Sequence, residues 1–143
     1  MKLRIVCFCL LLGLTAFATP NERVLKTFNG SFPSADSVKW FDDGDGYQVH
    51  FFQNKMRCKI WYDAQGEVTK SIRYYLGSEL PPLILARIQK RFEGKEIFGV
   101  TEISSSSDLA YHIILQDDKK WYEVTSDSVG NLVMNKKLIK AKG

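Results

Sequence analysis

Two stretches of the chain alternate apolar and polar positions as the strands of a half-buried sheet do. From Tyr47 to Val68 the sequence reads YQVHFFQNKMRCKIWYDAQGEV, and from Tyr111 to Leu132 it reads YHIILQDDKKWYEVTSDSVGNL. In each stretch a polar break separates two runs with a period of two, which predicts a strand, a turn and a second strand. The second stretch follows the first at an offset of 64 residues without a gap. Self-similarity at one spacing predicts two copies of one supersecondary unit.

A segment with helical spacing precedes each stretch. The apolar positions at this spacing are Val24, Leu25 and Phe28 in the first segment, and Ile84, Leu85, Ile88 and Phe92 in the second. Pro81 suits a first helical turn, while Gly30 and Gly94 suit left-handed caps after the last turn. We therefore predict one helix over residues 20–29 and another over residues 81–93.

Extended pieces over residues 37–41 and 96–103 add one strand to each unit ahead of the alternating stretches. Asp63 with Gly66, and Asp127 with Gly130, are typical of type I turns that close a hairpin onto a further strand. The side chains expected beneath the helices are Tyr47, Val49, Phe51, Cys58, Ile60, Tyr111, Ile113, Leu115, Tyr122 and Val124. The prediction is an α+β fold: two tandem helix-plus-four-strand repeats, about 20–78 and 79–140, forming one antiparallel sheet with both helices on one face.

The first 18 residues, MKLRIVCFCLLLGLTAFA, have the pattern of a secretory signal peptide. Lys2 and Arg4 precede a short apolar run, and Ala16 and Ala18 form a small-residue cleavage site. Export to the periplasm or the extracellular space is therefore expected, with residues 19–143 as a single domain and no stable membrane insertion after cleavage. Cleavage lowers the formal charge from +4 to +2, and a solubilising C-terminal tail explains the remaining lysines without a nucleic-acid partner.

Cleavage also leaves Cys58 as the single cysteine. An exported protein with one thiol has no internal disulfide, so packing must supply its stability. Because Cys58 continues the apolar alternation between Met56 and Ile60, we interpret it as a small buried hydrophobe.

Several residues combine into a family pattern: FP-x4-VKW from Phe32 to Trp40, a strand led by Tyr47, and the YD-x2-G hairpin from Tyr62 to Gly66. The chain resembles the secreted bacterial PepSY-like family, whose members are similar to the β-lactamase inhibitor protein. The resemblance covers the whole of residues 19–143. It implies tandem helix-plus-four-strand units, an envelope or extracellular location, and protein binding or enzyme inhibition. No inhibitory loop matches residue by residue, so β-lactamase inhibition does not carry over.

The sequence offers no clear catalytic or metal site. The acidic run from Asp42 to Gly46 lacks the ligand spacing of a calcium loop and suits a solvated turn. His50 and His112 are not equivalent under the offset and have no Cys or carboxylate cluster beside them, which favours solvent-facing strand positions over a zinc site. No nucleophile has a recognisable base or orienting partner. We therefore expect no enzyme, no cofactor and no metal.

The sheet face away from the helices is unusually aromatic for a surface. Trp, Tyr, Phe and Arg dominate binding hot spots because they bury much area for little lost rotamer freedom. The candidate partner-binding residues are Phe52, Arg57, Trp61, His112 and Trp121, with Arg73 and Tyr75 as a candidate extension. This pattern favours a protein-binding, peptide-binding or inhibitor-like module. Two other functions stay open: a small-molecule or ion-sensing envelope protein that uses the same face as a pocket, and a hydrolase, which would require an accessible nucleophile. A purely structural reading also stays open, in which the aromatic pairs only stabilise the sheet or a loop or the C-terminal tail covers the face.

Overall fold

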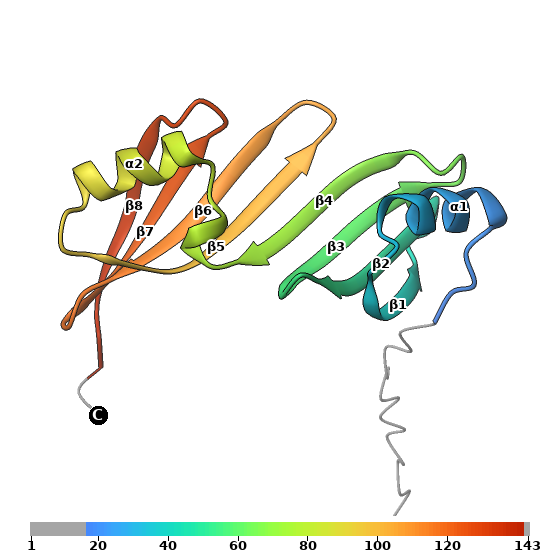
Figure 1. Cartoon of the computed structure of the whole chain (residues 1–143), viewed down its shortest axis with the longest axis horizontal. Coiled ribbons are helices and arrows are strands. Elements are labelled where there is room, and N and C mark those ends of the chain that lie inside the picture. Colours follow the sequence, from blue (N-terminus) through green and yellow to red (C-terminus); the bar gives the residue numbers. More distant parts are fainter. Residues whose placement is uncertain (1–16, 142–143) are drawn as a thin grey trace, which may run out of the picture.

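The computed structural model describes residues 17–141 and has two helices over one antiparallel sheet. The strands follow one another in sequence order across the sheet, β1 to β8 (Figure 1). The elements are α1 (Glu22–Ser31), β1 (Asp36–Asp42), β2 (Gly46–Gln53), β3 (Met56–Asp63), β4 (Val68–Tyr75), the short helix η1 (Gly77–Glu79), α2 (Pro82–Arg91), β5 (Glu96–Ser105), β6 (Leu109–Gln116), β7 (Lys120–Asp127) and β8 (Leu132–Ile139). The α+β prediction is confirmed.

Both helices lie on the same side of the sheet, at opposite ends of it, with β4 and β5 between them (Figure 1). Residues that pair across two strands point to the same face of the sheet, so a face can be followed from strand to strand through the pairs. Cys58 pairs with Arg73, Arg73 with Glu102, and Glu102 with Tyr111. The buried residues under α1 and those under α2 therefore belong to one continuous helix-side face.

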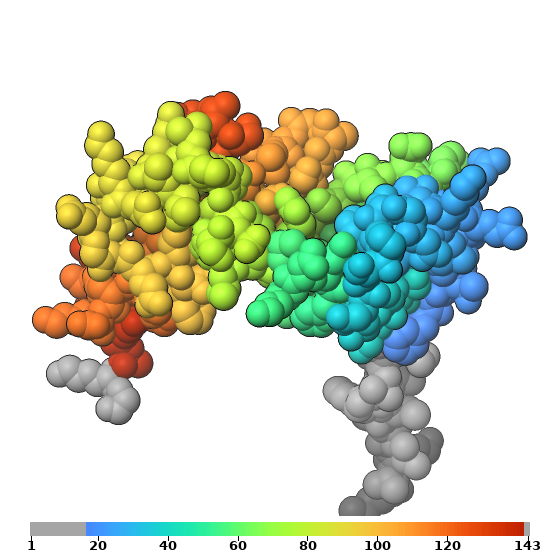
Figure 2. All heavy atoms as spheres, viewed as in Figure 1, coloured from blue at the N-terminus to red at the C-terminus, as the bar shows by residue number. Residues whose placement is uncertain are grey.

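Each helix covers its own apolar cluster. Val24 and Phe28 of α1 pack on Val49, Phe51 and Ile60, as the alternation predicted. The cluster under α2 is larger and includes Ile84, Ile88, Val100, Tyr111, Ile113, Leu115, Tyr122 and Val124. Met56 packs against both clusters, so the two cores touch although each has its own helix. In the space-filling view this arrangement appears as two lobes joined by a narrower waist (Figure 2).

The predicted helix boundaries are correct to within about two residues, but the two glycine caps differ. Asn21 caps α1, where its side-chain oxygen accepts a hydrogen bond from the Val24 backbone N–H at 3.0 Å. Gly94 has a φ of +74° and occupies the left-handed position beyond α2. Gly30 instead lies inside α1, which continues to Ser31. The predicted left-handed cap at Gly30 is therefore wrong, because one more helical residue follows it.

The two predicted hairpin turns are confirmed and have the same construction. The Gly66 N–H donates to the Asp63 carbonyl at 3.1 Å, and the Gly130 N–H donates to the Asp127 carbonyl at 3.2 Å. Both glycines have positive φ, +88° and +84°, which favours glycine strongly. Each turn also lies against a helix: a Cβ at Gly66 would come within 3.2 Å of the Arg23 carbonyl oxygen, and one at Gly130 within 3.1 Å of Arg87 Cδ.

Cys58 is buried, with 4% of its surface exposed, as predicted. The predicted signal peptide, residues 1–18, lies outside the described residues except for Phe17 and Ala18. Phe17 forms an isolated antiparallel bridge with Phe41 of β1. Within residues 17–141, no helix has the length and apolar character needed to cross a membrane.

Candidate functional site

The face of the sheet opposite the helices, here called the outer face, carries no helix of the described chain. Its side chains alternate with the buried ones along every strand. On β2 and β3 they include His50, Phe52, Arg57, Lys59 and Trp61, and on β6 and β7 they include His112, Ile114, Trp121 and Glu123. All five predicted partner-binding residues lie on this face.

One line of cross-strand partners runs across the outer face from β2 to β8. We call it the central row, and its members are Phe52, Arg57, Tyr74, Thr101, His112, Thr125 and Val133. Phe52 at one end is 45% exposed and Val133 at the other is 56% exposed. Neighbours in the row are about 5 Å apart, so three of the predicted residues, Phe52, Arg57 and His112, share one continuous strip.

Aromatic rings on the outer face are paired with cations. The Arg57 guanidinium lies 4.4 Å from the centre of the Tyr74 ring. Lys70 Nζ lies 5.0 Å from the Trp61 ring, and Lys140 Nζ lies 4.6 Å from the Trp121 ring. Such contacts fix the rings and leave a cationic, aromatic surface. The alternation of the sequence predicted the aromatic residues but not these cation partners, because the partners come from other segments of the chain.

The two tryptophans do not lie together. Trp61 and its partner Lys70 lie toward the end of the sheet where β5 ends at Ser105. Trp121 and its partner Gln116 lie on the other side of the central row. They are four strands apart and displaced by eight residues along the strand direction, which corresponds to about 30 Å across the sheet. Trp121 instead contacts Phe98 edge to face, with 4.8 Å between ring centres. A small ligand cannot touch both tryptophans, but a protein surface can.

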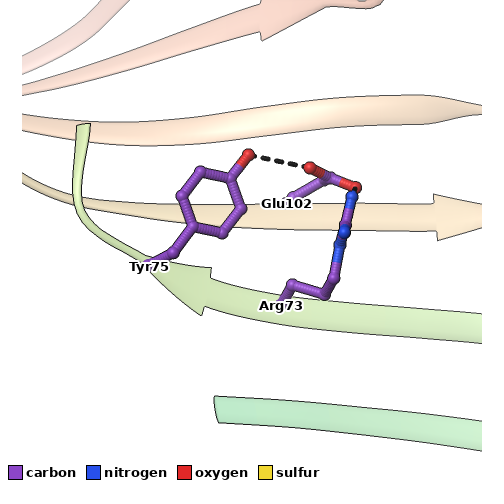
Figure 3. A network of polar contacts seen from close by, with 3 residues as sticks. All are labelled: Arg73, Tyr75 and Glu102. Carbon is purple, nitrogen blue, oxygen red and sulfur yellow. Dashed lines mark hydrogen bonds and ion pairs between the residues drawn. The ribbon is translucent and has the colours of Figure 1, made fainter. Parts of the chain in front are cut away.

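Arg73 and Tyr75 lie on the helix side and do not extend the outer face, so that part of the sequence prediction is wrong. Both reach the Glu102 carboxylate on β5 (Figure 3). Tyr75 Oη donates to Glu102 Oε2 at 2.7 Å, and Arg73 Nε donates to Oε1 at 3.1 Å. The physical reason is a β-bulge between Trp61 and Tyr62, which shifts the β3–β4 register by one residue. A shift of one residue moves every later side chain to the other face.

A hollow of about 200 Å³ opens on the outer face where β1, β2 and β3 meet. Lys39, His50, Arg57, Lys59 and Phe52 line it. Lys39 pairs with His50, and His50 pairs with Lys59, so an unbroken row of basic groups crosses three strands. This hollow could not be predicted from the sequence, because the spacing between positions 39, 50 and 59 does not reveal how the three strands are aligned.

His50 is half-buried and not the solvent-facing strand residue that the sequence analysis expected. Its ring centre lies 4.6 Å from that of Phe41. Its Nε2 is buried and has no hydrogen-bond partner among residues 17–141. Burial lowers the pKa of His50, and the nearby charges of Lys59, Arg57 and Lys39 lower it further. His112, by contrast, is exposed in the central row, as predicted.

The other candidate sites have structural explanations. In the acidic turn, Asp42 Oδ1 accepts a hydrogen bond from the Gly44 N–H at 2.8 Å, which stabilises the turn. Over the described part of the chain, no group of three His, Cys, Asp or Glu residues is placed to hold a metal ion. Burial raises the pKa of the Cys58 thiol, which makes it a poorer nucleophile.

Comparison with known proteins identifies the fold only. No protein-family model matches the sequence, and no curated protein matches it either. The structure is similar to that of a BLIP-like protein from Bacteroides fragilis, with a TM-score of 0.62 and 15% identity over 90% of this chain and 93% of that one. It is also similar to a DUF2874 family protein from Bacteroides ovatus, with a TM-score of 0.58 and 19% identity over 85% of this chain and 89% of that one.

A third similar structure is a proposed periplasmic protein from Bacteroides eggerthii, with a TM-score of 0.58 and 14% identity over 85% of this chain and 90% of that one. These similarities span nearly the whole of each chain. The shared architecture fits the resemblance to β-lactamase-inhibitor-like proteins that the sequence motifs indicated.

Proposed function

We propose that the protein is an exported, non-enzymatic binding module that holds a protein or peptide partner on the outer face of its sheet. The observation that carries this proposal is the central row, in which Phe52, Arg57 and His112 form a strip across the sheet that no helix of residues 17–141 covers. Trp61 and Trp121 extend the contact surface to either side. Exposed aromatic residues next to cations are typical of binding hot spots.

Several further features support the same function. Signal-peptide-like residues at positions 1–18 favour export, and the PepSY-like motifs favour an envelope protein built from two repeats over residues 19–143. The BLIP-like similarity in fold supports a binding role in preference to catalysis. The distance of about 30 Å between Trp61 and Trp121 suits a macromolecular partner, since one partner must span the sheet to contact both.

Affinity capture from the native envelope and culture fluid tests this proposal. The bait is the exported full chain, compared with an Arg57→Ala/Trp61→Ala variant whose fold has been verified. The matched control is Leu83→Ala, which alters a 54% exposed apolar residue on the helix side of the molecule. A partner retained by the wild type and by the control, but lost by the outer-face variant, supports the proposal. Equal retention by all three baits contradicts it.

A small-molecule or ion-sensing envelope protein is the second candidate function. The hollow of about 200 Å³ at β1–β3 favours it, because it gives the outer face a concave site beside Phe52 and Arg57. A compound that raises the unfolding temperature in the absence of any protein partner would favour this alternative.

A further inference from the structure

The hollow lined by Lys39, His50, Arg57 and Lys59 is a site of uncompensated positive charge. His50 lies directly between Lys39 and Lys59 in the strand register, and Arg57 lies one row away next to Phe52. Within residues 17–141, none of the three permanent cations forms an ion pair with an acidic side chain. Like charges this close repel one another, so a bound anion would relieve a cost already present in the folded protein.

We propose that this hollow binds a carboxylate group carried on a short apolar stem. The assignment does not depend on the macromolecular partner proposed above. The Arg57 guanidinium lies 4.4 Å from the centre of the Tyr74 ring and forms no ion pair within residues 17–141. A guanidinium can donate two parallel hydrogen bonds to one carboxylate. Phe52 supplies an apolar wall for the stem. A volume of about 200 Å³ admits a carboxylate with a few methylene groups.

The buried Nε2 of His50 provides the second argument for a ligand. A buried polar atom without a partner is costly, and native proteins rarely leave one. A carboxylate oxygen in the hollow would give Nε2 an acceptor once that nitrogen carries a proton. Among residues 17–141, the site thus has one buried polar atom without a hydrogen-bond partner and three cations without an ion-pair partner. One anionic ligand would supply a partner to all of them.

Proton uptake by His50 should accompany binding. The charged groups on the adjoining strands are Lys39 on β1, and Arg57 and Lys59 on β3, with Asp36 and Asp42 at the two ends of β1 and Asp63 at the end of β3. Burial and the three cations hold the pKa of His50 down in the free protein, whereas a bound carboxylate would raise it. Affinity should therefore rise as the pH falls from about 8 to about 6, where carboxylates remain ionised.

The test is an NMR titration of the exported full chain with sodium butanoate at low ionic strength, following the His50 ring and Arg57 Nε–H signals. The expected result is a saturable shift of both signals that neutral butanamide does not reproduce. Lys39→Gln/Lys59→Gln, a variant of two lysines at the hollow, should weaken binding about tenfold or more. Lys26→Gln, which removes an exposed lysine of α1 on the helix side, should leave the affinity unchanged.

Three results would overturn the proposal: equal shifts with butanamide, equal weakening in Lys26→Gln, or tighter binding of inorganic phosphate than of butanoate. Arg57→Lys gives an independent check, because it keeps the positive charge but removes the guanidinium that donates two parallel hydrogen bonds. Unchanged affinity in this variant would exclude the assigned geometry. The peptide acetyl-Gly-Glu-Gly-amide identifies the source of the carboxylate. Tighter binding of this peptide than of butanoate indicates an acidic peptide side chain, and the reverse order indicates a free small carboxylate.

Discussion

The hydroxyl of Tyr75 on β4 donates a 2.7 Å hydrogen bond to Oε2 of Glu102 on β5. Glu102 is only 7% exposed, and its other carboxylate oxygen accepts hydrogen bonds from Arg73. This network lies where the fourth and fifth strands join the two lobes (Figures 1 and 3). It is therefore a polar connection across the seam between the two apolar clusters, which also touch through Met56.

Arg73→Ala should lower the free energy of unfolding by about 1–3 kcal/mol, because it leaves the buried Glu102 carboxylate without its cation. Tyr75→Phe should cost about 1 kcal/mol, since one oxygen of Glu102 would keep its partner. Urea unfolding measures both values. The double variant Arg73→Leu/Glu102→Leu is the control and should recover most of the loss, because no charge stays buried alone. Single variants within about 0.5 kcal/mol of the wild type would show that the network contributes little.

Gly66→Ala and Gly130→Ala should each destabilise the protein by about 1–2 kcal/mol, because both positions have positive φ. The new methyl group would also press on α1 or α2. Gly30→Ala is the matched control: it lies within α1, has no neighbour within 4 Å of the added Cβ, and should be neutral or slightly stabilising. The melting temperatures of the three variants measure this difference in stability. Equal melting temperatures would contradict this account of the turns.

The Asp117 carboxylate should make stability depend on pH in the acid range. Its hydrogen bond from Tyr122 Oη at 2.6 Å, with two backbone donors, lowers its pKa from 3.8 to about 2. Between these values the unfolded chain binds more protons than the folded one, so stability falls as the pH drops from about 4 to about 2. Denaturant midpoints across this range should fall less steeply for Asp117→Asn than for the wild type. Parallel pH profiles for the two proteins would contradict the assignment.

Trp61→Ala and Trp121→Ala should each lower stability by about 1 kcal/mol through loss of a cation–π contact, and their effects should add. Additivity follows from the separation of about 30 Å, which prevents any shared contact. Denaturant unfolding of the single and double variants measures this. A loss of about 3 kcal/mol or more from either substitution, typical of a core aromatic residue, would remove that ring from the proposed binding surface.

Alternation along a strand predicted the buried faces correctly, because Val49, Ile60, Tyr111 and Val124 lie in uninterrupted stretches of period two. It failed at Arg73, because the bulge opposite Trp61 and Tyr62 leaves Thr69 of β4 as an extra residue between Val68 and Lys70, which no local pattern reveals. The cationic hollow was missed for a related reason. Residues 39, 50 and 59 come together only through the register of three strands, which side-chain period alone does not determine.

The most direct measurement of the central claim is photo-crosslinking in cells that export the full chain. Two variants each carry one photoreactive amino acid. In the test variant it replaces His112, which is exposed in the central row, and in the control variant it replaces Gln89, which is exposed on α2. The outer-face account predicts a specific crosslinked partner from position 112, none from position 89, and loss of the product when Arg57→Ala/Trp61→Ala is added. Crosslinking from position 89 alone, or a product at 112 that persists in that variant, would contradict it.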